Sequence, residues 1–285
     1  MPHDLLTRLV AEIGLDAYAD RLAAAAADAI RLMPEPAEEH RLPLGASRLG
    51  GVPDLGPSQE WPHWSNGPQS FIAQLALTDL RTFPVAAVFP TEGWLSFFYN
   101  AQQDTWGFDP KDQGSFQILY TPPGPLHRVP CPSDLEGQSI YELCAIQFSK
   151  DFSLPARDSL AFATAGLSSI PEPELNELED RLAREQQWAG RSILFGHPDQ
   201  IQNEMQTECA LVTGGLYCGD PSGYKDPRAV TLRQMAPSWR LLLQVASEDR
   251  ASMMWGDAGC LYYWMRHEDM TSQAFDRAWM ILQCS

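Results

Sequence analysis

Two aspartates and two glutamines recur in matching sequence contexts, and their side chains are of types that could bind a ligand. Asp54 and Asp199 each follow a Gly-x-Pro tripeptide. In such a turn, proline fixes one dihedral angle and aspartate accepts hydrogen bonds from the next backbone N–H groups. Gln74 and Gln244 each interrupt an apolar, strand-like run, where a buried amide needs hydrogen-bond partners. Both pairs fit either a ligand site or a structural hydrogen bond, and the structural interpretation is favoured.

Asp257 is the strongest single candidate for a functional acid. The glycines at positions 256 and 259 would let a ligand approach closely, although a tight turn before a strand explains them equally well. Tryptophans in loops, such as Trp61, could form a stacking surface for a peptide, a sugar or a partner protein. More often, a loop tryptophan closes over a core. The candidate ligand-binding residues are therefore Asp54, Gln74, Asp199, Gln244, Asp257, Trp61 and Trp255.

No complete motif for catalysis, phosphate binding or metal binding is present. In the segment 219–223, Ser222 stands one position late for a nucleophile elbow, and the glycine-rich stretch 214–223 lacks the Gly-Lys-Ser/Thr end of a phosphate loop. The six histidines are scattered along the sequence. One of them, His197, could titrate near neutrality. We therefore assign no catalytic residue, no metal and no cofactor, and whether the protein is an enzyme stays open.

Aromatic and β-branched runs, separated by Pro, Gly, Asp and Asn, predict the strands that would position these residues. The predicted strands are 70–77, 94–99, 116–120, 141–148, 239–245, 260–265 and 279–284. Between the two groups of strands, residues 171–190 predict a helix with Leu175, Leu178 and Leu182 on one face. Shorter helices are expected at 200–213, with Ile201 inward, and at 268–275.

The first 40 residues predict a helical extension. Leu5, Leu9 and Ile13 make one apolar stripe, and a second stripe runs from Leu15 to Ile30. Prolines at 34 and 36 end the second helix, and residues 34–43 are interpreted as a linker. We expect this extension to be an accessory that packs on the core.

The two groups of strands share a motif order that suggests an internal duplication. In each half, a Gly-x-Pro-Asp turn precedes a strand that carries one glutamine, and a glycine-started aromatic strand follows. The matching segments are 51–54 with 196–199, 71–75 with 241–245, and 93–98 with 259–264. Two such copies, about 48–150 and 191–285, would be related by a pseudo-twofold axis.

The same motifs carry a family resemblance. The strings Gly-Gly-Val-Pro-Asp at 50–54, Ser-Phe-Ile-Ala-Gln-Leu at 70–75, Trp-Gly-Phe-Asp-Pro at 106–110 and Trp-Gly-Asp-Ala-Gly at 255–259 resemble the YwqG-like family of bacterial proteins. The resemblance runs from about residue 48 to the C-terminus. It implies the family's fold and no catalytic set, because the family is a domain of unknown function. Some members are encoded beside toxin genes, which makes an immunity or regulatory role conceivable.

Composition and charge limit the classes of molecule that could bind this protein. The chain has 285 residues, 44% of them hydrophobic, and its 37 acidic residues against 20 Lys and Arg give a net charge of −17. Such a field repels polyanions, so nucleic acid and anionic membranes are excluded, and a basic protein or a cationic ligand is favoured. The start of the chain is acidic where a signal peptide is basic, and the six cysteines form no Cys-x-x-Cys pair. We therefore expect a cytoplasmic protein with free thiols.

These observations lead to one fold and two functions. The fold is α+β, with antiparallel sheets in two duplicated halves, an N-terminal helical extension over 1–40 and a single domain over 41–285. The favoured function is a non-enzymatic binding or regulatory protein whose acidic surface meets a protein partner. The alternative is a small-ligand-binding protein or hydrolase-like enzyme with a cleft between the halves, in which the candidate residues would converge.

Overall fold

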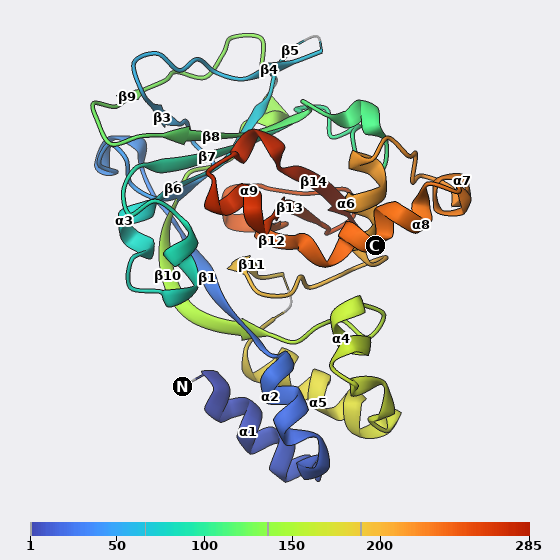
Figure 1. Ribbon diagram of the computed structural model, residues 1–285. Helices are drawn as coiled ribbons and strands as arrows, with labels where there is room; N and C mark the ends of the chain where they lie inside the picture. The colour runs from blue at the N-terminus through green and yellow to red at the C-terminus, as the bar shows by residue number, and fades with distance from the viewer. Residues whose placement is uncertain (1, 66, 136, 189) are drawn as a thin grey trace.

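In the residues that the computed structural model describes (2–65, 67–135, 137–188 and 190–285), ten strands form one antiparallel sheet (Figure 1). Their order across the sheet is β14-β13-β12-β11-β1-β10-β2-β6-β7-β8. The strands are β1 (Ala27–Pro36), β2 (Arg48–Leu49), β6 (Ser70–Ala76), β7 (Trp94–Tyr99), β8 (Phe116–Thr121), β10 (Cys144–Ser153), β11 (Ser192–Phe195), β12 (Trp239–Ala246), β13 (Cys260–Arg266) and β14 (Trp279–Gln283). Outside this sheet, β3 (Asp54–Leu55) pairs with β9 (His127–Arg128), and β4 (His63–Trp64) pairs with β5 (Gly67–Pro68). The predicted α+β class with antiparallel strands is confirmed.

Short helices connect and cover the strands. They are α1 (Pro2–Ile13), α2 (Ala19–Ala25), α3 (Leu77–Leu80), α4 (Leu160–Thr164), α5 (Glu172–Glu185), α6 (Met205–Thr213), α7 (Pro221–Lys225), α8 (Ala229–Leu232) and α9 (His267–Thr271), with a 3₁₀ helix η3 at Pro84–Val88. Within the described residues, no helix is both long enough and apolar enough to cross a membrane.

The sheet curls until its two edge strands approach each other. The ring of Phe116 on β8 packs edge-on against Trp279 on β14, with ring centroids 5.4 Å apart. The Trp279 indole N–H donates to the Gly107 carbonyl at 2.8 Å, and the Leu282 N–H donates to the Trp106 carbonyl at 3.1 Å. These bonds join β14 to the loop before β8. Neither of the two edge strands, β14 and β8, is therefore exposed over its entire length.

The central strand β1 corrects the prediction for residues 15–43. The second helix ends at Ala25, and Ala27–Pro36 form a strand that pairs with β10 along its whole length and with β11 between Ala29 and Leu32. Pro34 is tolerated because it lies beyond the β11 pairing, where the missing N–H removes no bond to that strand. The predicted linker therefore contains the end of a strand, followed by a 3₁₀ turn at Glu39–Arg41.

The N-terminal helices belong to a separate helical layer. Leu9 and Leu22 from α1 and α2 are buried in one cluster with Leu178 and Leu182 of α5 and Phe152 of β10. In Figure 1 these helices gather at one end of the molecule, away from α6 to α9. They cover the connection between the two groups of strands, and β10 joins this layer to the sheet.

Most of the other predicted elements are present. The strands expected at 70–77, 94–99, 116–120, 239–245, 260–265 and 279–284 and the helix expected at 171–190 are found with ends shifted by a few residues at most. The strand expected at 141–148 starts at Cys144 and continues to Ser153. The helix expected at 200–213 starts only at Met205, and Ile201 is exposed, not inward.

Candidate functional site

Asp54 and Gln74 meet in a closed hydrogen-bond network. The fully buried Asp54 carboxylate accepts from Arg48 at 2.7 Å, from Arg128 at 2.9 Å and from the Gly45 N–H at 2.8 Å. The Gln74 Oε1 accepts the backbone N–H of Asp54 at 2.7 Å, and the Gln74 amide donates to the Asp54 carbonyl at 3.2 Å. The network satisfies the buried groups internally, so it fixes the chain rather than opening toward a ligand.

Asp199 and Gln244 form a comparable network in the other half of the sheet. Arg191 donates to both Asp199 oxygens at 2.8 Å, and the Gln244 Oε1 accepts the Asp199 N–H at 2.8 Å. Arg191 also pairs with the buried Asp151 at 2.9 Å, and the Tyr262 hydroxyl donates to the Asp199 carbonyl at 2.6 Å. Four strands separate β6, which carries Gln74, from β12, which carries Gln244. The structure thus brings each pair together but does not bring the two pairs into one cleft.

The remaining candidates lie apart from both networks. Asp257 is exposed in the turn before β13, where its backbone carbonyl accepts the Ser285 N–H at 3.2 Å. Trp255 is fully buried, with its ring 5.2 Å from Tyr141 and 6.4 Å from Tyr99. Trp61 is also buried, and its indole N–H donates to the Gln69 carbonyl at 2.7 Å. Both tryptophans are core residues here, and a ligand role for Asp257 stays a prediction.

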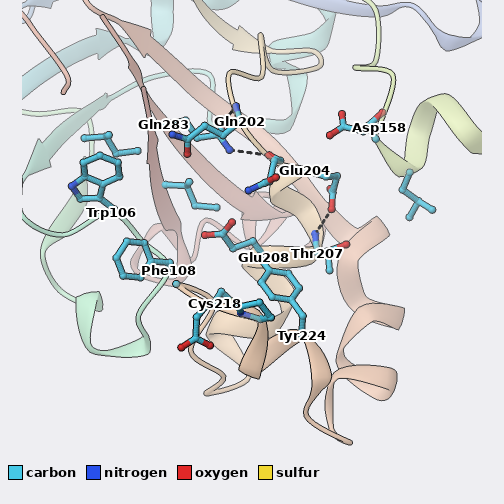
Figure 2. Close-up of a pocket in the computed structure, with 18 of the residues that line it drawn as sticks. Trp106, Phe108, Asp158, Gln202, Glu204, Thr207, Glu208, Cys218, Tyr224 and Gln283 are labelled. Carbon is cyan, nitrogen blue, oxygen red and sulfur yellow. Dashed lines mark hydrogen bonds between the residues drawn. The ribbon is translucent and has the colours of Figure 1, made fainter. Parts of the chain in front are cut away.

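A pocket of about 920 Å³ opens elsewhere, between the sheet edge and the helices that follow β11 (Figure 2). Five segments line it: the loop 106–108, the start of α4, residues 202–208, residues 218–225 and strand β14. Its floor is formed where α6 packs on β14. None of the sequence-predicted candidates is among the lining residues.

Acidic side chains dominate the polar part of this pocket. Glu204 caps α6, accepting the N–H groups of residues 206 and 207 at 2.6 and 2.9 Å. Asp220 caps α7, and Asp158 accepts from the Gln200 amide at 2.8 Å. With Glu208, four carboxyl groups line the pocket against one basic residue, Lys225.

Glu208 is the buried acid of the pocket. In Figure 2 it lies between Phe108 and Tyr224, and the Tyr224 hydroxyl is its hydrogen-bond partner. Burial and the nearby Glu204 carboxylate raise the pKa of Glu208 to about 7, and the hydrogen bond from Tyr224 opposes this shift. A carboxyl group half-ionised near neutrality in an accessible pocket is typical of a functional group.

Aromatic rings form the opposite wall. Gly107 makes this possible: its φ is +86°, and a Cβ there would lie 2.1 Å from the Met280 carbonyl, so only glycine lets the loop dock on β14. The docking places Trp106 and Phe108 on the pocket, and the Phe108 carbonyl accepts the Cys218 N–H at 2.8 Å. Rings opposite carboxylates suit a cation that carries apolar surface.

Cys218 does not supply a nucleophile. Burial, with a smaller contribution from Glu208, raises the pKa of Cys218 to about 12, so the group is a thiol at neutral pH. It is one of six free cysteines, five of them buried. Within the described part of the chain, no three His, Cys, Asp or Glu side chains are grouped as metal ligands would be. The residues present therefore suit the binding of an organic cation better than covalent catalysis.

The sequence contained one signal for this site that the motif search passed over. Along the helix that ends at Thr213, Met205, Cys209 and Val212 form a buried stripe, and Glu208 lies on the same face. An acid in an apolar helical stripe is rarely buried without a partner. The aromatic wall had a weaker signal, since Trp106 is one of the loop tryptophans that could form a stacking surface, but the docking of its loop follows from no sequence pattern.

Glu208 should lower stability as the pH rises. The folded protein holds this proton with a pKa of about 7, and an unfolded glutamate releases it near pH 4.5, so folding takes up a proton between these values. The free energy of unfolding then falls as pH rises through this window, by about 3 kcal/mol in total. We expect Glu208→Gln to match the wild type at pH 5 and to exceed its stability at pH 8, in urea denaturation. Parallel pH profiles of the two proteins would contradict the burial of this acid.

Comparison with protein families gives one match. Residues 47–284 match the family model DUF1963, described as a domain of unknown function. The matched segment begins after β1, so the central strand and the N-terminal helices lie outside it. A search of curated proteins finds no match.

Proposed function

Because this chain belongs to the DUF1963 family, whose description assigns no activity, its own pocket is the best guide to its function, and we propose that it is a binding protein for a basic protein partner. The pocket around Glu208 takes a cationic side chain of that partner. The observation that carries the proposal is the convergence of four carboxyl groups and three aromatic rings (Trp106, Phe108 and Tyr224) in one open pocket.

The charge of the protein supports a cationic partner. The net charge of −17 steers basic molecules toward the surface, and the pocket offers carboxylates where such a molecule would dock. A guanidinium or ammonium group there would pair with Glu208 and stack near the aromatic wall. A buried ion pair of this kind provides specificity, because the uncharged analogue leaves the Glu208 carboxylate without a partner.

The rim of the pocket favours a protein over a free amine. Leu160, Ile201 and Tyr217 line the pocket or adjoin its lining residues, and they are exposed by 42%, 37% and 41%. Leu160 lines the pocket, Ile201 precedes the lining residue Gln202, and Tyr217 packs edge-on against Phe108 with ring centroids 5.7 Å apart. Exposed apolar side chains around a charged pocket are typical of an interface in which a charged side chain enters and apolar neighbours cover the rim.

A pair of peptides tests this proposal. Acetyl-Leu-Arg-Leu-amide should bind in a calorimetric titration at pH 8, and the same peptide with citrulline in place of arginine should bind at least about tenfold more weakly. Glu208→Gln should cause a similar loss for the arginine peptide. Asp257→Asn is the matched control, since it removes one negative charge from an exposed turn outside the pocket. Equal affinity for both peptides, or an equal loss in both variants, would contradict the proposal.

If the protein is regulatory, we propose that it acts by inhibiting its basic partner. An immunity-type protein would use the same pocket and rim to cover a basic toxin in the cytoplasm. The hydrolase-like alternative has one observation in its favour, the pKa of about 7 of Glu208, which suits general acid–base catalysis. It is less supported because Cys218 is held as a thiol and the residues expected in a cleft between the halves lie in separate networks.

Two finer assignments belong to the same proposal. We propose that the chain is YwqG-like within DUF1963, on the motif strings given above, and that its halves arose by duplication. The duplication is supported by Gln74 and Gln244, whose side chains accept the N–H of Asp54 and Asp199 in the same way. It is also supported by irregularities in pairing at matching places, between Phe71 and Ala73 and between Leu241 and Leu243.

A further inference from the structure

A second pocket, of about 1120 Å³, lies on the other side of α4. It opens between α2 and α4 on one side and η3, β11, β12 and β13 on the other. Ser159, Leu160 and Glu204 line both pockets, whereas Ala163 lines only the Glu208 pocket and Ala161 lines only this one. We call it the α2–α4 pocket. Its volume slightly exceeds the range of about 300–1,000 Å³ that is usual for small-molecule sites.

The walls of the α2–α4 pocket are mainly apolar and include a strained residue. Val85, Val88, Leu241 and Met270 contribute aliphatic surface. Phe195 lines the same pocket with a φ of +61°, a left-handed conformation that a bulky residue rarely adopts. Such strain persists where the surrounding structure enforces it, and it gathers at ligand sites.

Two buried hydrogen-bond donors at this pocket lack acceptors. Trp239 and Trp264 line it and are only 1% and 2% exposed. Neither indole N–H has a hydrogen-bond partner in the described residues. A buried indole N–H normally finds an acceptor, so the wall of this pocket contains two unpaired polar groups, although both nitrogen atoms are closed to solvent.

The charged side chains around the pocket indicate the charge of the ligand that it favours. Arg21 and Arg240 line it, with His267 beside them, in a protein whose net charge is strongly negative. Of the two acids that line it, Asp28 and Glu204, the second is committed to the N–H groups of α6. Burial lowers the pKa of His197, which also lines the pocket, and the positive charge of Arg240 lowers it further, so Arg240 acts on the pocket interior. An anionic acceptor is therefore favoured.

We propose that the α2–α4 pocket binds a small amphipathic anion, a carboxylate with an apolar chain. The chain lies along Val85, Val88 and Leu241, and the carboxylate pairs with Arg240. This site adjoins the cation pocket around Glu208, but the residues that recognise the anion do not line that pocket.

Dodecanoate is the probe, used below about 1 mM so that it stays monomeric, with dodecyltrimethylammonium as the probe of opposite charge. In calorimetry we expect saturable binding of dodecanoate at one site and at least tenfold weaker binding of the ammonium compound. Ala161→Trp should fill the pocket and weaken dodecanoate binding at least tenfold. Ala163→Trp, two residues along the same helix, should leave it unchanged and should instead weaken binding of the arginine peptide.

The variants also separate failure of this proposal from failure of the first. Thermal melting verifies that each variant is folded, and Arg240→Gln provides a second variant, with an expected loss of at least fivefold, if Ala161→Trp does not fold. The proposal is overturned by absence of saturable dodecanoate binding, by equal binding of both surfactants, or by equal effects of the two tryptophan substitutions. None of these outcomes changes the expected result for the arginine peptide with the wild-type protein.

Discussion

We expect that deleting residues 1–40 abolishes cooperative unfolding, whereas deleting residues 1–26 lowers the melting temperature and leaves a folded protein. The first deletion removes β1, the strand that joins β10 to β11 at the centre of the sheet. Its loss removes two sets of strand pairs. One joins β1 to β10, from Ala27 opposite Ser153 to Pro36 opposite Cys144, and the other joins β1 to β11, from Ala29 opposite Phe195 to Leu32 opposite Ser192. It also removes the buried side chains of Ile30 and Leu32, each contributing about 2 kcal/mol.

The combined loss exceeds the net stability of an ordinary domain, about 5–15 kcal/mol. The shorter deletion removes only α1 and α2, which exposes apolar residues of α5 and Phe152 but leaves every pair of the central sheet intact. Urea denaturation followed by circular dichroism and tryptophan fluorescence distinguishes the two. A cooperative transition in the 1–40 deletion would contradict the central position of β1 and would favour the accessory extension expected from the sequence.

We expect Asp54→Ala to destabilise the protein by about 3–5 kcal/mol and Asp257→Ala to change stability by less than about 0.5 kcal/mol. Both substitutions remove one carboxylate from a turn-like segment, so they are matched in charge. Burial is the largest effect on Arg48 and lowers its pKa, and the attraction to Asp54 is the main effect that opposes it. Without Asp54, the Arg48 guanidinium, which is fully buried, keeps only its weaker partners.

The measurement is the midpoint of urea unfolding for both variants at one pH. Arg48→Met in the Asp54→Ala background should recover part of the loss, because the buried cation, left with Glu39 as its carboxylate partner, is then absent. A loss below about 1 kcal/mol in Asp54→Ala would show that the network around it is not a structural one, and a ligand role for this residue would regain support.

The sequence predicted elements whose side-chain pattern follows their own geometry. The strands β6, β7, β12 and β13 combine aromatic and aliphatic residues between turn-forming ones, and α5 has leucines at helical spacing, so local pattern and tertiary position agree. In β1 they disagree. Its residues continue a helical stripe from Leu22 through Ala26 to Ile30, and only pairing with β10 and β11 makes the segment a strand.

The functional residues divide in a similar way. Motif repetition marked Asp54, Gln74, Asp199 and Gln244 as residues with hydrogen bonds to satisfy, and each forms them. The two aspartates, however, pair with arginines instead of capping the next backbone N–H groups, as the turn interpretation expected. It did not find the Glu208 pocket, because five segments that are distant in the sequence form it and none carries a motif of its own. Burial of Glu208, the property that shifts its pKa, is a consequence of how α6, α7 and the loop 106–108 pack.

Proton release on binding tests the central claim most directly. Calorimetric titration of acetyl-Leu-Arg-Leu-amide at pH 7, in two buffers with different ionisation enthalpies, measures the protons exchanged when the peptide binds. Since the pKa of Glu208 is about 7 in the free protein and a bound guanidinium favours the carboxylate, we predict release of about half a proton per peptide. We also predict an affinity that rises from pH 6 to pH 8, and loss of both effects in Glu208→Gln. Binding without proton release, with the same affinity at both pH values, would contradict the account.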